Sequence, residues 1–247
     1  GKYMKIACPK DKREYIVESA LFHPQYKGGD INRYKLSHNG RYVLFPYANG
    51  QLISKADFEK QYPLTMKYLL EHKSFLESRE NGKMKGNQWY GYTRSQALTS
   101  MEQPKLLTPE YYAHPAFCLD SSGNAFFFGG GAGGYAIVPK GIKPEVLLGI
   151  LNSKLVSWFM RKTSIRQYQT AYSFVKKYIE KIPIKPFLNK TDEDRFSRLV
   201  LSMLDLHSRQ AVTPTEKEQL NRLESATDVF IDRMVYELYE LAEEEIR

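Results

Sequence analysis

The stretch that decides the fold is Pro144–Phe159, which reads PEVLLGILNSKLVSWF and is strongly apolar. Proline is favoured in the first turn of a helix, where its missing N–H is not needed. The apolar positions that follow cover one broad helical face. They are Val146, Leu147, Ile150, Leu151, Leu155, Trp158 and Phe159. We expect one long helix here that fills the core.

Short β-prone runs precede this helix and predict a small, mostly antiparallel sheet. The runs lie at Lys105–Thr108, Ala116–Leu119, Ala125–Phe128 and Tyr135–Val138. The sequence Asp120-Ser-Ser-Gly123 between two of them is typical of a turn.

Closer to the N-terminus the same reasoning predicts further strands and a helix. Tyr3–Ala7 and Tyr42–Tyr47 are β-prone and are separated by Gly, Asn and Pro. Apolar residues then return at helical spacing, which predicts an amphipathic helix over Pro63–Arg79. Its apolar positions are Leu64, Tyr68, Phe75 and Leu76.

The C-terminal segment predicts two helices joined by a short break. The first starts at Thr191 and carries the apolar stripe Phe196, Leu199, Val200, Met203, Leu204 and His207. Ala211–Pro214 ends it, and Thr215 starts a second helix that runs to about Glu240, with apolar positions at i, i+3, i+4 and i+7. We therefore predict an α+β fold, a mostly antiparallel sheet globule with packed helices and a C-terminal helical hairpin. The hairpin either packs on its own body or docks another domain.

Charge divides the chain in the same place. Residues 1–190 hold 29 Lys and Arg against 14 Asp and Glu, whereas residues 191–247 hold 7 against 14. A basic, aromatic body suits nucleic acid, because cations gain affinity by releasing counterions from phosphates. A basic but inert surface remains the alternative. We expect residues 1–190 to be one domain that binds nucleic acid and residues 191–247 to be a C-terminal helical hairpin that acts as a spacer or docks another domain.

Known catalytic and cofactor motifs do not fit this sequence. Gly129, Gly131 and Gly134 form a G-x-G-x-x-G pattern, but a β-prone run follows it instead of the helix that a nucleotide site needs. The Glu71-His72-Lys73 triplet has nuclease-like spacing but lies in a predicted helix. Cys8 and Cys118 are far apart, and neither a disulfide nor a zinc site is indicated. We expect no catalytic, cofactor or metal site in this chain.

Polar and basic loop segments are the best candidates for contacts to DNA. They lie at Lys27–Tyr34, Asn81–Tyr90 with Tyr92 and Arg94, and Arg161–Gln169. Arg, Lys and Gln side chains can reach phosphates or base edges, whereas Trp89 and Tyr90 suit the core better. We predict that one DNA-binding face holds Arg33, Lys35, Lys83, Lys85, Arg94, Arg161, Lys162, Arg166 and Gln167.

Several segments follow one another in an informative order. They are Gly29–Tyr34, Phe45–Tyr47, Trp89–Tyr90, Pro104–Leu106, Leu151–Leu155, Lys181–Ile184, Tyr236–Leu241 and Glu244–Ile246. This order resembles a known family, the TaqI-like C-terminal specificity domain of adenine-specific DNA methyltransferases and type IIG restriction–modification enzymes. The resemblance implies that the chain reads double-stranded DNA, with residues 1–190 as the DNA target recognition domain. It also implies that an N-terminal methyltransferase domain of the same chain binds S-adenosylmethionine and methylates adenine N6.

The resemblance does not transfer base contacts, and the Asn-Pro-Pro-aromatic catalytic motif is absent from these 247 residues. The chain starts with Gly1 and not Met, so we expect it to be a piece of a longer restriction–modification protein. The two distant cysteines favour the reducing cytoplasm. Because no apolar run is long enough to span a membrane, we expect no membrane partner. Three alternatives stay open at this point. They are a type I specificity subunit-like DNA-binding protein, a non-enzymatic protein-interaction scaffold and an RNA-binding module.

Overall fold

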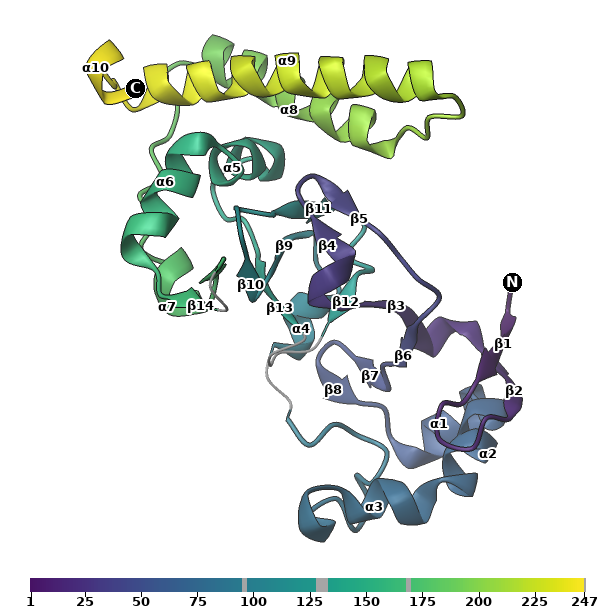
Figure 1. Ribbon diagram of the computed structural model, residues 1–247. Helices are drawn as coiled ribbons and strands as arrows, with labels where there is room; N and C mark the ends of the chain where they lie inside the picture. The colour runs from purple at the N-terminus through teal and green to yellow at the C-terminus, as the bar shows by residue number, and fades with distance from the viewer. Residues whose placement is uncertain (95–96, 128–132, 168–169, 247) are drawn as a thin grey trace. The chain divides into compact units, whose positions relative to one another are not determined.

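The chain folds into two compact units in the computed structural model, which describes residues 1–94, 97–127, 133–167 and 170–246 (Figure 1). Both units combine helices with small antiparallel sheets, which confirms the predicted α+β class. Unit 1 comprises Gly1–Gln25, Gly40–Gln103 and Asn124–Phe126, and unit 2 comprises Tyr26–Asn39, Pro104–Gly123 and Phe127–Arg247.

Unit 1 is made of short strands and short helices. Its strands are β1 (Tyr3–Ala7), β2 (Glu14–Glu18), β3 (Phe22–Tyr26), β6 (Tyr42–Leu44), β7 (Tyr47–Ala48), β8 (Gln51–Leu52) and β12 (Phe126–Phe127). Its helices are η1 (Ser19–Leu21), α1 (Lys55–Gln61), α2 (Pro63–Glu71), α3 (Lys73–Gly82) and α4 (Leu98–Met101). β1 and β2 pair as an antiparallel hairpin, with Tyr3 opposite Glu18 and Ala7 opposite Glu14.

The helix predicted over Pro63–Arg79 is two helices, so this prediction was wrong in detail. α2 ends before His72, which has a φ of −107° and a ψ of 9° and so lies outside helical geometry. The predicted apolar positions therefore do not form one continuous buried face. Leu64 in α2 and Phe75 in α3 are 38% and 49% exposed. Thr65, Met66 and Leu69 are buried instead.

Unit 2 holds the larger core. Its strands are β4 (Ile31–Asn32), β5 (Lys35–Leu36), β9 (Lys105–Pro109), β10 (Tyr111–Tyr112), β11 (Cys118–Asp120), β13 (Gly134–Ile137), β14 (Arg166–Gln167) and β15 (Ala171–Ser173). Its helices are η2 (Gly28–Asp30), α5 (Pro144–Leu151), α6 (Lys154–Thr163), α7 (Lys176–Ile179), α8 (Lys190–Ser208), α9 (Pro214–Leu238) and α10 (Glu243–Ile246).

The predicted central sheet forms with one strand fewer. β9 lies between β11 and β13, and both pairings are antiparallel. The strand expected at Ala125–Phe128 is shorter in the described residues and, as β12, belongs to a different sheet in the order β12-β3-β6. Sequence alone gave no partner for this run, because β-propensity does not specify which strand pairs with which.

The apolar stretch 144–159 fills the core, but as two helices instead of one. Ser153 accepts a hydrogen bond from the Val156 N–H and so caps the start of α6. Asn152 bonds both the N–H and the carbonyl of Phe117, at 2.9 Å each. The change of direction leaves Trp158, predicted to face the core, 58% exposed.

The C-terminal helices form the predicted hairpin, and α8 and α9 run alongside each other (Figure 1). Their starts differ slightly from the prediction, because Asn189 caps α8 and Thr213 caps α9 through a capping box with Glu216. α8 packs on α5, and α9 contacts α6, so the hairpin is part of the core of unit 2.

No helix in the described part of the chain is both long and apolar enough to cross a membrane. The division of roles at residue 190 stays a prediction about function.

Candidate nucleic-acid interface

The segment Lys27–Tyr34 forms a tight hairpin in unit 2. Ile31 pairs with Leu36 and Asn32 with Lys35, so Arg33 and Tyr34 form the turn. Tyr34 has a φ of +59°, and its N–H donates to the Phe117 carbonyl at 2.9 Å. This bond and the burial of the Tyr34 ring fix the turn on the core, while Lys35 stays exposed.

Arg33 is bound by acceptors of its own unit. Its guanidinium donates to the Asn152 carbonyl at 2.8 and 3.2 Å and forms two hydrogen bonds with the Asp228 carboxylate. Burial disfavours the charged guanidinium, but the bond from Asp228 outweighs it and raises the pKa of Arg33. Arg33 therefore ties the hairpin to α9, and its role on DNA stays a prediction.

The basic segment after α6 lies at the surface of unit 2. Arg161 and Lys162 are in the last turn of α6, and both are exposed. The Arg161 Nη2 lies 2.8 Å from His114 Nδ1. Arg166 is exposed, and Gln167 partly so, on the edge strand β14, whereas Tyr168 and Gln169 of this predicted segment lie outside the described residues.

Two tyrosines connect this segment to the hairpin. The Tyr112 hydroxyl donates to Asn32 Oδ1 at 3.2 Å, and Asn32 stands opposite Lys35. Tyr112 pairs with Tyr172 on β15, and Tyr172 stands opposite Arg166 on β14. Strand pairings and one side-chain hydrogen bond thus connect Lys35 to Arg166 through Asn32, Tyr112 and Tyr172. We call the exposed cations of this region, Lys35, Arg161, Lys162 and Arg166, the β14 surface.

In unit 1 the predicted segment Asn81–Tyr90 runs from the end of α3 along the surface and ends at two buried aromatic residues. Arg79, predicted as the end of a helix, donates to the carbonyls of Leu76, Trp89 and Gly91 at 2.7 to 2.9 Å. Trp89 and Tyr90 are 3% and 5% exposed, which confirms them as core anchors.

The loop itself carries cations at the surface. Glu80, Asn81 and Gly82 all have positive φ, so the chain leaves helical geometry in the last residues of α3. Lys83 and Lys85 are exposed, and the Arg94 side chain is 84% exposed, 4.0 Å from a Glu80 oxygen. These three candidates belong to unit 1, whereas the β14 surface belongs to unit 2.

Sequence reasoning missed Tyr112, Tyr172 and His114, which support or border the β14 surface. The signal was weak, because a two-residue strand such as β10 leaves no periodicity to read. The glycines Gly129 and Gly131 lie outside the described residues. Gly134 begins β13, and a Cβ there would lie 2.5 Å from the Thr108 carbonyl oxygen, so this glycine allows β13 and β9 to approach closely.

Compared with known protein families, residues 23–184 match the TaqI-like C-terminal specificity domain. Among curated proteins, the chain is 28% identical over 167 residues to the type II restriction enzyme and methyltransferase RM.Eco57I of Escherichia coli. It is 23% identical over 238 residues to the type II methyltransferase M.BstVI of Geobacillus stearothermophilus.

These matches cover 60% and 96% of this chain but only 17% and 37% of the two relatives. Among solved structures, the chain has the fold of part of the type IIL restriction–modification enzyme MmeI, determined in complex with DNA. The TM-score is 0.59 at 13% identity, over 92% of this chain and 29% of MmeI.

Proposed function

Because the chain belongs to the family of TaqI-like C-terminal specificity domains, we propose that it is the sequence-specific DNA-recognition domain of a restriction–modification methyltransferase. Both curated relatives are type II methyltransferases, one of them also a restriction enzyme. The observation that carries the proposal beyond the family is the β14 surface. Its exposed cations come from two segments more than 120 residues apart, which strand pairings and one side-chain hydrogen bond connect.

The chemistry of this surface suits a duplex. Lysine and arginine neutralise phosphates and fix the register of a protein on DNA, and a guanidinium can also bind the O6 and N7 atoms of guanine. Arg166 lies on an edge strand, and strands and loops of this kind can enter a groove. We assign phosphate contacts to Lys35 and Lys162 and a base contact to Arg166.

We further propose that the methyl transfer is performed elsewhere in the parent protein. In this proposal an N-terminal domain of the same chain binds S-adenosylmethionine and modifies adenine N6. This domain would contain an Asn-Pro-Pro-aromatic motif, which does not occur in the 247 residues. The coding sequence upstream of Gly1 tests this: a motif of this type following a predicted strand supports the assignment, and an upstream region without one contradicts it.

The DNA-binding proposal makes a quantitative prediction for Lys162. Replacing it by alanine removes one phosphate contact, so the slope of log K against log salt should fall by about 0.9 for duplexes of any sequence. Fluorescence anisotropy with labelled duplexes measures this. Lys217→Ala is the matched control, because Lys217 is an exposed lysine in the first turn of α9, a helix that contributes no residue to the β14 surface.

Selection from a random duplex library then tests sequence recognition. We expect the unaltered chain to enrich one short sequence, and Arg166→Ala to lose about 1–3 kcal/mol of preference at one base pair of it. The proposed function would be excluded if Lys162→Ala and Lys217→Ala reduced the salt slope equally. It would also be excluded if the chain preferred structured RNA over every duplex.

A further inference from the structure

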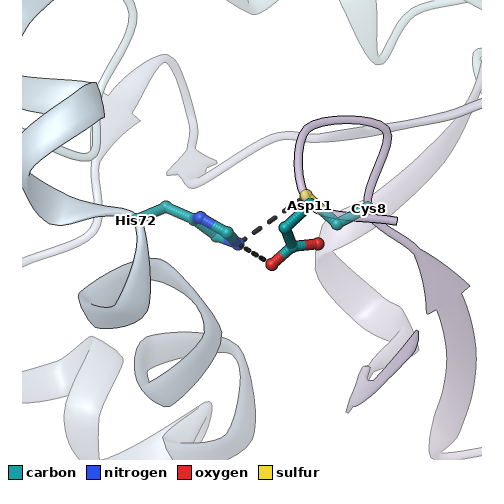
Figure 2. A group of neighbouring side chains, drawn as sticks. All are labelled: Cys8, Asp11 and His72. Carbon is teal, nitrogen blue, oxygen red and sulfur yellow. Dashed lines mark hydrogen bonds and ion pairs between the residues drawn. The ribbon is translucent and has the colours of Figure 1, made fainter. Parts of the chain in front are cut away.

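In unit 1, two side chains near the β1–β2 turn meet a third that is 64 residues further along the chain than the first. Cys8 follows β1, Asp11 lies in the turn between β1 and β2, and His72 lies between α2 and α3. Figure 2 shows the imidazole of His72 pointing at both the sulfur and the carboxylate. The His72 Nε2 is 3.6 Å from Cys8 Sγ and 3.6 Å from Asp11 Oδ2. The three ligand atoms lie within 4.8 Å of one another.

We propose that Cys8, Asp11 and His72 bind a zinc ion. Zinc takes thiolate, imidazole and carboxylate ligands at about 2.3, 2.0 and 2.0–2.2 Å in tetrahedral geometry. These bond lengths place a ligating sulfur and nitrogen about 3.5 Å apart, close to the 3.6 Å between Cys8 and His72. Nε2 faces both partners and can therefore donate its lone pair to one ion between them.

Neighbouring side chains hold the Asp11 carboxylate and the His72 ring in place. Tyr15 donates to Asp11 Oδ2 at 2.6 Å, and Arg13 binds the same carboxylate. These bonds hold the Asp11 carboxylate in a fixed orientation beside His72. Ligating carboxylates are commonly hydrogen-bonded in this way. The rings of Tyr15 and Tyr68 meet His72 edge-on, with centroids 5.8 and 5.0 Å away.

The ion would join the β1–β2 turn to the junction of α2 and α3. Cys8 is 5% exposed and, with His72, lines a cavity of about 620 Å³. Three protein ligands leave a fourth zinc position, which we assign to a water on the side of this cavity. The inference is independent of the proposed function, because it concerns none of the residues assigned to DNA.

Metal titration of the whole chain tests the site. We expect one Zn²⁺ per chain in competition with a chromophoric chelator, and a thiolate-to-metal charge-transfer band when Co²⁺ replaces Zn²⁺. Cys8→Ser should abolish the band, and His72→Gln should weaken Zn²⁺ binding by at least about 100-fold, more than loss of an outer hydrogen bond does. Cys118→Ser is the matched control, because Cys118 is a buried cysteine of unit 2.

Alkylation of the unaltered chain gives an answer that does not depend on any variant folding. Zn²⁺ should slow the modification of Cys8 by a soluble alkylating reagent, measured by mass spectrometry of the peptide that contains it. The proposal is overturned if Cys8 reacts at the same rate with and without Zn²⁺. It is also overturned if Co²⁺ gives no thiolate band with the unaltered chain, or if the band persists in folded Cys8→Ser.

Discussion

At the scale of single residues, the buried carboxylate of Glu18 caps the start of α2. α2 begins after Tyr62, which provides no side-chain cap. Glu18, at the end of β2, accepts from the N–H of Thr65 at 2.8 Å, from its hydroxyl at 2.6 Å and from the N–H of Leu64 at 3.1 Å. The first N–H groups of a helix need such acceptors. Glu18 thus fastens α2 to the β1–β2 hairpin.

We predict that Glu18→Gln destabilises the chain by about 1–2 kcal/mol at neutral pH, the usual effect of losing a cap or a charged hydrogen bond. Burial alone would raise the pKa of Glu18, but the bonds from Thr65 and Leu64 lower it below 4.5. A lowered carboxyl pKa stabilises the fold above the unfolded pKa, and this stability is lost as pH falls through the folded value.

Urea denaturation at a series of pH values measures this effect. The difference between the two proteins should be constant above pH 4.5, the ordinary value for this carboxyl, and shrink below it. Glu59→Gln, on the exposed side of α1, is the control. A difference that grows towards low pH would contradict the capping role.

At the scale of elements, α5 and α8 approach so closely that only glycine fits between them. A Cβ on Gly149 would lie 2.5 Å from Val200 Cγ2 and 2.8 Å from two ring atoms of Phe196. Phe196 and Val200 are fully buried and belong to the core, so neither has free space to move into. The glycine therefore sets the distance between the two helices.

We expect Gly149→Ala to lower the stability of unit 2 by up to about 2 kcal/mol. Overpacking usually costs about 1–3 kcal/mol, and the higher helix propensity of alanine offsets about 1 kcal/mol of this cost. Thermal unfolding followed by near-ultraviolet circular dichroism measures it. Gly29→Ala is the control, because a Cβ there has nothing within 4 Å. An unchanged or raised midpoint for Gly149→Ala would show that α8 can move away.

At the scale of the whole molecule, the acidic segment 191–247 packs directly against residues of the basic segment 1–190. Asp228 binds Arg33, and Asp232 accepts from the Lys154 N–H at 2.8 Å. The apolar faces of α8 and α9 contribute fully buried side chains to the core that α5 begins, among them Phe196, Met203, Ile231 and Val235. The charge boundary in the sequence is therefore not a boundary between separately folded bodies.

This packing predicts that residues 1–190 without the hairpin do not form a stable unit 2, because the apolar face of α5 would be exposed to water. Limited proteolysis of the shortened chain should cleave within 140–185, and near-ultraviolet circular dichroism should lose part of its signal. The same cleavage pattern in the full chain, or cooperative unfolding of the shortened one, would mean that the hairpin is a separate appendage.

The sequence by itself determined the α+β class, the strand Tyr3–Ala7, the hairpin of α8 and α9, the core role of Trp89 and Tyr90, and the family resemblance. These follow from local periodicity, caps and segment order, which are properties of neighbouring residues. Only the tertiary structure decided that Arg33 pairs with Asp228, that β12 joins β3, and that Cys8, Asp11 and His72 meet. Cys8 and His72 are 64 residues apart, and Arg33 and Asp228 are 195 apart. The proximity of such partners depends on how whole elements pack, which no local pattern encodes.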